Sequence, residues 1–153
     1  MIEEPSPFWK GWYSQKFRGP GLRYEVAVSL KQGDIVWING PYECVWPDIK
    51  IFRDSLISFL DPFERVEADD GYVGEQPAKC KTPGGFASHS DNVAGELRNR
   101  IRSRHETVNA RLNYFGALKQ LYRHSLLDHG AVFRAVAILC QLSFENGEPL
   151  FSL

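Results

Sequence analysis

The feature that most constrains the fold is a run of residues, 22–30, in which apolar side chains alternate with mostly polar ones. The apolar positions are Leu22, Tyr24, Val26, Val28 and Leu30. This period of two is typical of a strand that buries one face. Residues 31–34 have turn composition, and the apolar run 35–38 ends at an Asn-Gly-Pro sequence. The sequence therefore predicts a β-hairpin near the start of the chain.

Three later segments have the apolar spacing of helices. The first covers residues 47–60, where Asp48 suits the positive end of the helix dipole. The second covers roughly residues 93–124, with apolar residues three, four and seven positions apart. The third covers residues 130–145 and is apolar nearly all round. That pattern predicts a helix buried on every side.

The order of elements predicts the fold class. A short strand is expected at residues 65–69, and the order is then strand, strand, helix, strand, helix, helix. This order is typical of an α/β fold, with a mixed sheet covered by helices. A chain of 153 residues has room for one domain. Its expected parts are 1–21 irregular, 22–72 sheet and first helix, 73–91 loop, and 92–153 helices.

Composition excludes several broad classes of protein. Apolar residues make up 43% and charged residues 24%, as in globular proteins, so global disorder is excluded. No apolar run approaches the roughly 18–20 residues of a membrane helix, and the first residues do not resemble a signal peptide. The three cysteines are widely spaced without a Cys-x-x-Cys motif, which favours a reducing compartment. We therefore expect a folded domain without disulfides or membrane contact.

Charge is unevenly distributed along the chain. Residues 1–91 carry ten Lys and Arg against fourteen Asp and Glu, whereas residues 92–153 carry eight against five. Five of the basic residues are arginines between Arg98 and Arg111. The local positive field permits a polyanionic partner without requiring one.

Asp69 and Asp70 stand where the predicted third strand ends and a glycine turn begins. Ligand and metal sites of open α/β sheets gather at the carboxyl ends of strands, so one of these acids is a candidate ligand. Adjacent side chains cannot both point into one cleft. The alternative is a solvated turn, in which Asp and Gly are common for backbone reasons.

Glu106 is a second candidate. At 100° per residue it stands opposite the apolar stripe of its helix, among short polar side chains and arginines. In one interpretation, Glu106 faces a cleft beside arginines that bind a phosphate backbone. In the other, it lies on a solvent-exposed helix face and pairs with Arg102. The histidines and cysteines show no metal-ligand spacing, and His105 borders the apolar stripe, where packing is expected.

Seven segments carry a resemblance to a known family. Taken in order, they resemble the DDE-type transposase endonuclease domain, most closely its IS5/Harbinger-like branch. The segments are EPSPF, WYSQKFRGPGLRYEVAVSL, GDIVWINGP, WPDIKIFRDSL, ERVEADDGYVGE, RSRHETVNARLNYFGALK and HGAVFRAVAILCQLSFENGEPLF. The resemblance spans nearly the whole chain.

The resemblance implies a ribonuclease H-like fold and an Asp-Asp-Glu triad. In the family, the triad holds two divalent metal ions, Mg²⁺ or Mn²⁺, that drive DNA phosphodiester cleavage and strand transfer. The second Asp of the family falls on Asp69, and its Glu falls on Glu106. The resemblance also implies location in the nucleus of a eukaryotic host. DNA contacts are then expected from Arg98, Arg102, Arg104, Arg111 and Lys119.

Two departures from the family pattern affect the expected activity. The family's first Asp lies upstream of the segment matched here by residues 2–8, so no position of this chain matches it. The family often has a basic residue where this chain has Asn113. Asp48 is not expected to complete the triad, because its segment matches one outside the triad.

The expectation is therefore a DDE-type domain with an incomplete first strand and no useful cleavage. The alternative is a non-catalytic DNA- or protein-binding remnant of a transposase. A strand edge left open by the missing first strand, at residues 22–30 or their neighbour, also predicts marginal stability and self-association.

Overall fold

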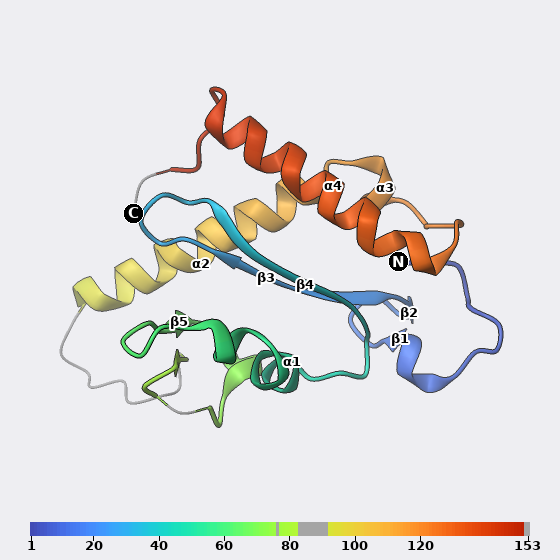
Figure 1. The fold of residues 1–153 in the computed structure, drawn as a ribbon, viewed down its shortest axis with the longest axis horizontal. Coiled ribbons are helices and arrows are strands. Elements are labelled where there is room, and N and C mark those ends of the chain that lie inside the picture. Colours follow the sequence, from blue (N-terminus) through green and yellow to red (C-terminus); the bar gives the residue numbers. More distant parts are fainter. Residues whose placement is uncertain (76, 83–91, 152–153) are drawn as a thin grey trace. The chain divides into compact units, whose positions relative to one another are not determined.

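The computed structural model of the chain describes residues 1–75, 77–82 and 92–151. The chain divides into two compact units: residues 1–46 with 102–153, and residues 47–101. The helix α2 (Asn92–Leu112) passes from the second unit into the first. Figure 1 labels the elements along the chain.

The hairpin of the first unit pairs β3 (Leu22–Val28) with β4 (Ile35–Glu43) in antiparallel register, with Val26 opposite Ile38. This confirms the predicted hairpin. The turn is closed by the Ser29 N–H, which donates to the Asp34 carbonyl at 2.8 Å. Gly33 takes a positive φ of 87° in this turn, a conformation that favours glycine.

The second strand continues past the Asn-Gly-Pro sequence that was expected to end it. Register shifts between Arg23 and Glu25, because Glu25 is opposite Asn39 whereas Arg23 is opposite Tyr42. Gly40 and Pro41 therefore both lie opposite Tyr24, so that β4 has one extra residue at a bulge. Gly40 supplies a φ of 129°, and the missing N–H of Pro41 costs no ladder hydrogen bond at a bulge.

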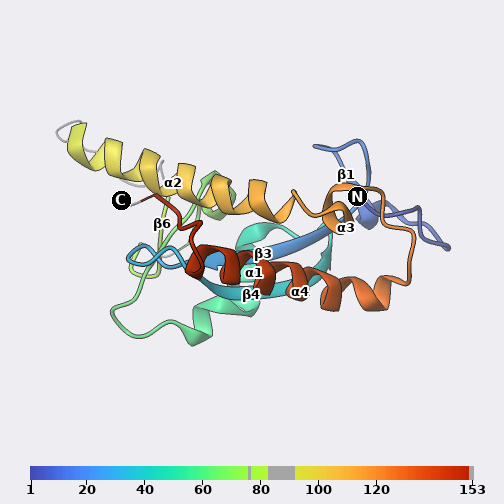
Figure 2. The same ribbon diagram turned by 90° about the horizontal axis from the view of Figure 1, so that it is seen from above.

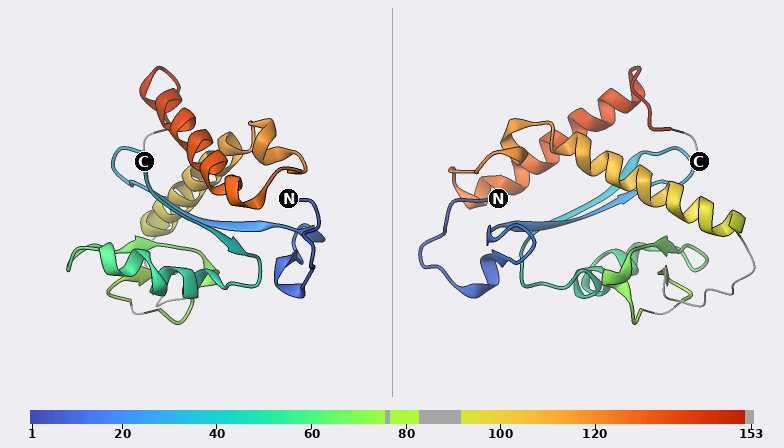
Figure 3. Two further views of the ribbon diagram at one scale, coloured as in Figure 1. Left: turned by 45° about the vertical axis from the view of Figure 1, so that its right-hand side comes forward. Right: turned by 180° about the vertical axis from the view of Figure 1, so that it is seen from behind.

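Two helices cover one face of this hairpin, as Figures 2 and 3 show. They are α4 (Leu126–Glu145) and the part of α2 that belongs to the first unit. Strand residues including Tyr24, Val26 and Ile38 pack against the buried helix residues. The buried cluster consists of Val108, Leu112, Phe133, Val136, Ala137, Cys140, Phe144 and Leu150.

The prediction of one helix over residues 93–124 was wrong beyond Leu112. α2 ends there, a short helix α3 (Gly116–Lys119) follows, and the chain then extends to Ser125. The cause is tertiary pairing. The Glu3 N–H donates to the Tyr122 carbonyl at 2.8 Å, and the Tyr122 N–H donates to the Met1 carbonyl at 3.2 Å. These bonds require an extended backbone.

The last helix is longer than predicted and is buried on one face only. Ser125 caps it, since its hydroxyl accepts from the Leu127 N–H at 3.3 Å, so the helix begins at Leu126. Leu127 is 94% exposed and Ile138 59% exposed, which overturns burial all round. The length and apolarity of α4 would allow it to cross a membrane, a test that core helices of soluble proteins also pass.

The first 21 residues, expected to be irregular, hold short regular pieces: η1 (Lys10–Trp12), β1 (Tyr13–Ser14) and β2 (Gly19–Pro20). Strands β1 and β2 pair in antiparallel fashion. The Val45 N–H donates to the Gly11 carbonyl, and the Gly21 N–H donates to the Trp12 carbonyl, both at 2.9 Å. These bonds fasten the segment to the hairpin unit.

The second unit begins with α1 (Asp48–Asp54) and η2 (Leu56–Phe59). The predicted helix over 47–60 is interrupted at Ser55, whose φ of −140° and ψ of −92° are not helical. The Ser55 hydroxyl donates to the Ile51 carbonyl at 2.5 Å, which satisfies an acceptor at the helix end. Ile51, Phe52 and Leu56 are buried in this unit.

A short parallel pair completes the second unit. Strand β5 (Val66–Glu67) pairs with β6 (Cys80–Lys81), which lies within the predicted loop 73–91. The single turn η3 (Asp70–Tyr72) follows β5, and the Tyr72 ring packs edge-on against Phe52. Residues 83–91 of the predicted loop lie outside the described part of the chain.

The fold class is α/β, as predicted. The described residues form three separate two-stranded sheets, of which β3–β4 and β1–β2 are antiparallel and β5–β6 is parallel. The expectation of a single mixed sheet is therefore not met in this part of the chain. Strand β5 is only two residues long, and its sheet holds only β6 beside it among the described residues.

Candidate functional site

Asp69 stands just past β5, as the turn pattern predicted. It is the N-cap of η3, and its Oδ1 accepts the Gly71 N–H at 2.9 Å. The side chain is exposed. The bond to Gly71 is the backbone reason for an acid in this turn, and it fixes the direction of the carboxylate without burying it. Asp70, the next residue, begins η3 and is also exposed.

The structure brings Asp48 to the same turn. Asp48 Oδ2 and Asp69 Oδ1 each lie 3.0 Å from the position that a Cβ on Gly71 would occupy. The two carboxylates therefore flank Gly71, at most twice that distance apart. Sequence reasoning had placed Asp48 outside the triad. The acid at the start of a helix was visible, but only the packing of α1 on η3 shows that it faces Asp69.

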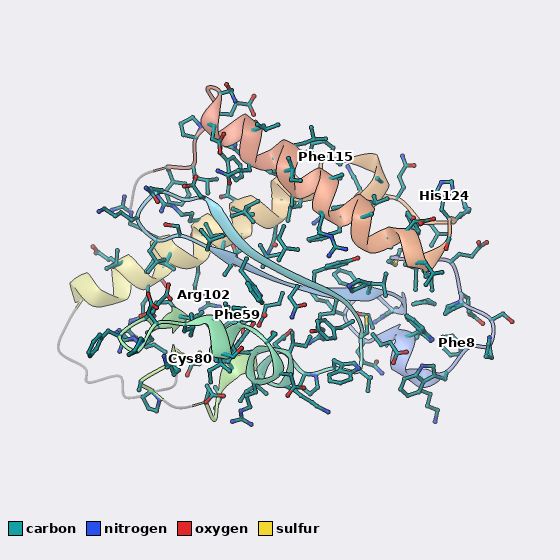
Figure 4. The ribbon with its side chains drawn as sticks, in the orientation of Figure 1. Phe8, Phe59, Cys80, Arg102, Phe115 and His124 are labelled. Carbon is teal, nitrogen blue, oxygen red and sulfur yellow. The ribbon has the colours of Figure 1, made fainter. Side chains whose placement is uncertain are left out.

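Glu106 lies on the exposed side of α2, as the helical spacing predicted. The residues two positions before and after it, Arg104 and Val108, are 3% and 0% exposed, whereas Glu106 itself is exposed. Arg102, one turn earlier, is exposed too, and is labelled in Figure 4. Glu106 belongs to the first unit and Asp69 to the second, so their convergence stays a prediction.

The described residues bring few metal-ligating side chains together. Within residues 1–75, 77–82 and 92–151, no three His, Cys, Asp or Glu side chains gather closely enough to hold an ion. Burial, and then the nearby Glu75 and Glu67 carboxylates, raise the pKa of Cys80 to about 11, so its thiol is protonated at neutral pH. Asp48 and Asp69 are an incomplete set of ligands for Mg²⁺, which requires near-octahedral oxygen coordination.

Two of the five predicted DNA-binding residues hold the protein's own backbone. Arg104 Nη1 donates to the Leu30 carbonyl at 2.7 Å, and its Nε donates to the Phe151 carbonyl at 3.1 Å. Arg111 donates to the Glu148 and Pro149 carbonyls. Both guanidinium groups therefore fasten the C-terminal segment to α2.

The other three predicted DNA-binding residues reach solvent. Arg102 and Lys119 are exposed, and Arg98 is half-buried. His105, expected to be packed, is half-buried, and its Nε2 lies 3.2 Å from the Val26 carbonyl. The surface of α2 thus offers fewer cations than its arginine count suggests.

A partly buried polar pair that sequence reasoning did not find lies between β3 and α4. The Tyr24 hydroxyl is 2.7 Å from His129 Nδ1, and the Tyr122 ring packs edge-on against His129. Burial, and then the charge of the Met1 amino group, lower the pKa of His129. Burial likewise raises the pKa of Tyr24, so its hydroxyl stays protonated and can donate.

Comparison of the chain with protein-family models, with curated proteins and with solved structures finds no match.

Proposed function

We propose that this chain is a DDE-type, transposase-derived domain with a ribonuclease H-like fold, whose remaining activity is DNA binding rather than DNA cleavage. The observation that carries the proposal is the position of Asp69. Its exposed carboxylate stands at the end of β5 and caps the following turn, at the position where the resemblance requires an acid. Along the chain, the hairpin, α1 and β5 precede Asp69, and α2 and α4 follow it, which is the strand and helix order predicted from the sequence.

The proposed acidic groups are Asp69 and Glu106. In the intact family, the divalent ions neutralise the charge that develops on the phosphate and align the attacking and leaving oxygens. This chain supplies two of the three carboxylates in matching positions, and the described residues gather no three-ligand group. We therefore assign this chain weak binding of Mg²⁺ or Mn²⁺ and no useful cleavage.

The proposed DNA contacts come from the exposed cations Arg102 and Lys119 and from the half-buried Arg98. Phosphate contacts of this kind hold DNA without reading its sequence, and the affinity falls as salt rises. Arg104 and Arg111 are left out because their donors bind carbonyl oxygens of the chain itself. We also propose that the chain is located in the nucleus of a eukaryotic host and that it self-associates through an open strand edge.

Binding is tested with a labelled DNA duplex, followed by fluorescence anisotropy at several salt concentrations. The wild-type chain should bind, and Arg102→Gln and Lys119→Gln should each reduce the slope of log affinity against log salt by about 0.9. Lys31→Gln, in the exposed β3–β4 turn, is the matched control and should leave the slope unchanged. A salt slope that none of these variants alters would refute the proposed DNA face.

Cleavage is tested separately by nicking of supercoiled plasmid with Mg²⁺ or Mn²⁺. We expect no cutting by this chain, and cutting by a version extended upstream with an aspartate segment of the family's type. Glu106→Gln should abolish the activity of the extended version. Equal cleavage by both versions, lost in each on Glu106→Gln, would show that a residue within this chain completes the triad.

A further inference from the structure

A group of exposed aromatic side chains lies outside the proposed acidic site, on the N-terminal segment of the first unit. Phe8 is 42% exposed, Trp9 50%, Tyr13 39% and Phe17 61%. The segment is blue in Figure 1, and Phe8 is labelled on it in Figure 4. Monomeric proteins seldom gather exposed aromatic rings in this way without a binding role.

The same segment is basic. Lys10, Lys16 and Arg18 are all exposed, and no Asp or Glu occurs from residue 5 to residue 24. One acid contacts this segment from β4, since Glu43 Oε1 accepts the Trp9 indole N–H at 3.1 Å. Aromatic rings and cations therefore share one surface, which we call the aromatic-basic surface.

The aromatic-basic surface contains a hollow of about 390 Å³, lined by Phe8, Lys10, Tyr13 and Gln15. This volume falls within the range of small-ligand pockets, about 300–1,000 Å³. The lining residues supply two aromatic rings, one ammonium group and one amide. A flat, aromatic and anionic unit with hydrogen-bonding edges matches each of these groups.

The backbone of this surface is held in place. The Trp12 carbonyl accepts the Gly21 N–H and the Gly11 carbonyl accepts the Val45 N–H, both at 2.9 Å. The Trp9 ring covers Gly11 so closely that a Cβ there would lie 2.0 Å from the ring. These contacts hold the backbone that leads into Tyr13, which lowers the ordering entropy lost there on binding.

We propose that the aromatic-basic surface binds single-stranded nucleic acid, with bases stacked on Phe8 and Tyr13 and phosphates held by Lys10, Lys16 and Arg18. Single strands combine unpaired base faces with a regular line of negative charge, the two features that this surface complements. The base faces of a duplex are stacked inside it, so a duplex can contact only the cations of this surface. The inference goes beyond the proposed metal site and does not depend on it.

The experiment measures anisotropy of a fluorescein-labelled oligothymidine in EDTA, which removes any contribution of the acidic residues through a metal ion. Phe8→Ala and Tyr13→Ala should each weaken binding by at least about fivefold, the lower end of base–aromatic stacking. Lys10→Gln should reduce the salt slope by about 0.7. Tyr13→Phe keeps a stacking ring and should bind as the wild type does.

The matched control is Phe63→Ala. Phe63 is fully exposed and lies between Asp61 and Glu64, so it is an aromatic residue in acidic surroundings and should not contribute. Circular dichroism checks that each variant is folded. Binding that is unchanged by Phe8→Ala and Tyr13→Ala would overturn the proposal, as would equal affinity for inorganic polyphosphate, because charge alone would then suffice.

A failure here is distinguishable from a failure of the proposed DNA face. The single-stranded probe tests residues 8–18, whereas the duplex assay tests Arg102 and Lys119. Loss of duplex binding with single-strand binding intact would leave this inference standing.

Discussion

At the scale of single residues, two buried polar side chains, Arg104 and His129, make contacts that hold the fold together. Arg104 lies in an arginine-rich helix, yet it is 3% exposed and binds two backbone carbonyls. His129 is 6% exposed and meets a tyrosine hydroxyl. Both groups have a structural role that residue type and position along the chain do not reveal.

We predict that Arg104→Met destabilises the fold by roughly 1–3 kcal/mol, because the carbonyls of Leu30 and Phe151 lose a charged donor in a buried place. Arg102→Met removes an exposed guanidinium and should change the free energy of unfolding by less than about 0.5 kcal/mol. Urea unfolding of both variants measures the difference. Equal stability of the two would contradict the structural role of Arg104.

We predict that stability falls as pH drops below about 6.5, the ordinary pKa of histidine. The pKa of His129 is lowered in the folded protein, so the unfolded chain takes up the proton first. The contribution of neutral His129 is complete above the unfolded pKa and is lost as pH falls through the folded pKa. Urea midpoints between pH 7.5 and 5.5 measure it.

The control for the pH prediction is His129→Gln, which keeps a polar side chain beside Tyr24 but does not titrate. Its midpoint should be lower than that of the wild type at pH 7.5 and should vary less with pH. An unchanged pH dependence in this variant would assign the effect to another group.

At the scale of elements, α4 shows how one helix serves two environments. Residues two positions apart differ by 200° around a helix, so Val136 and Ile138 face opposite sides. Val136 is 5% exposed and belongs to the buried cluster, whereas Ile138 is 59% exposed. The nearly uniform apolar sequence of α4 hides this difference.

We predict that Val136→Asp prevents folding, because an unpaired carboxylate would be buried against the hairpin at a cost of several kcal/mol. Ile138→Asp should fold and should change stability by less than about 0.5 kcal/mol. Circular dichroism and thermal melting compare the two. Loss of folding in Ile138→Asp would mean that the outer face of α4 is covered by a part of the molecule or a partner.

At the scale of the whole molecule, the DDE proposal requires that the two proposed acidic groups act together. Asp69 belongs to the unit of residues 47–101 and Glu106 to the unit that contains the hairpin. Only α2, which passes between the units, and the Trp46–Pro47 junction join them along the chain. A shared metal ion is the physical link that the DDE proposal requires.

We predict energetic coupling between Asp69 and Glu106 in metal binding. Calorimetry measures the Mn²⁺ affinity of four proteins, which together form a double-mutant cycle. They are the wild type, Asp69→Asn, Glu106→Gln and the double variant. Carboxylates that share an ion should give a coupling of at least about 0.5 kcal/mol. Fully additive losses would place the two residues at separate positions and would refute the shared site.

Asp48 offers an internal check on that cycle. Its carboxylate flanks Gly71 together with that of Asp69. Coupling of Asp69 with Asp48 but not with Glu106 would therefore locate the cation at the η3 turn, within the second unit alone.

The sequence by itself determined the features that depend on local periodicity. Alternation placed β3, an apolar run placed the start of β4, helical spacing put Glu106 on the exposed side of α2, and turn chemistry put Asp69 just past β5. The positions of β3 and Glu106 follow from side-chain directions that repeat every 2 or 3.6 residues, and that of Asp69 follows from the backbone preferences of Asp and Gly in turns. The α/β class follows from their order.

Only the tertiary structure decided the rest, because it depends on contacts between residues far apart in the chain. Backbone pairing with residues 1–3 kept residues 120–125 extended, and a bulge let β4 continue through Pro41. Packing on the hairpin chose one face of α4 for burial. Arg104 donates to the carbonyls of Leu30 and Phe151, which are far from it in the sequence. A buried guanidinium needs hydrogen-bond acceptors, and only the fold decides which acceptors lie near it.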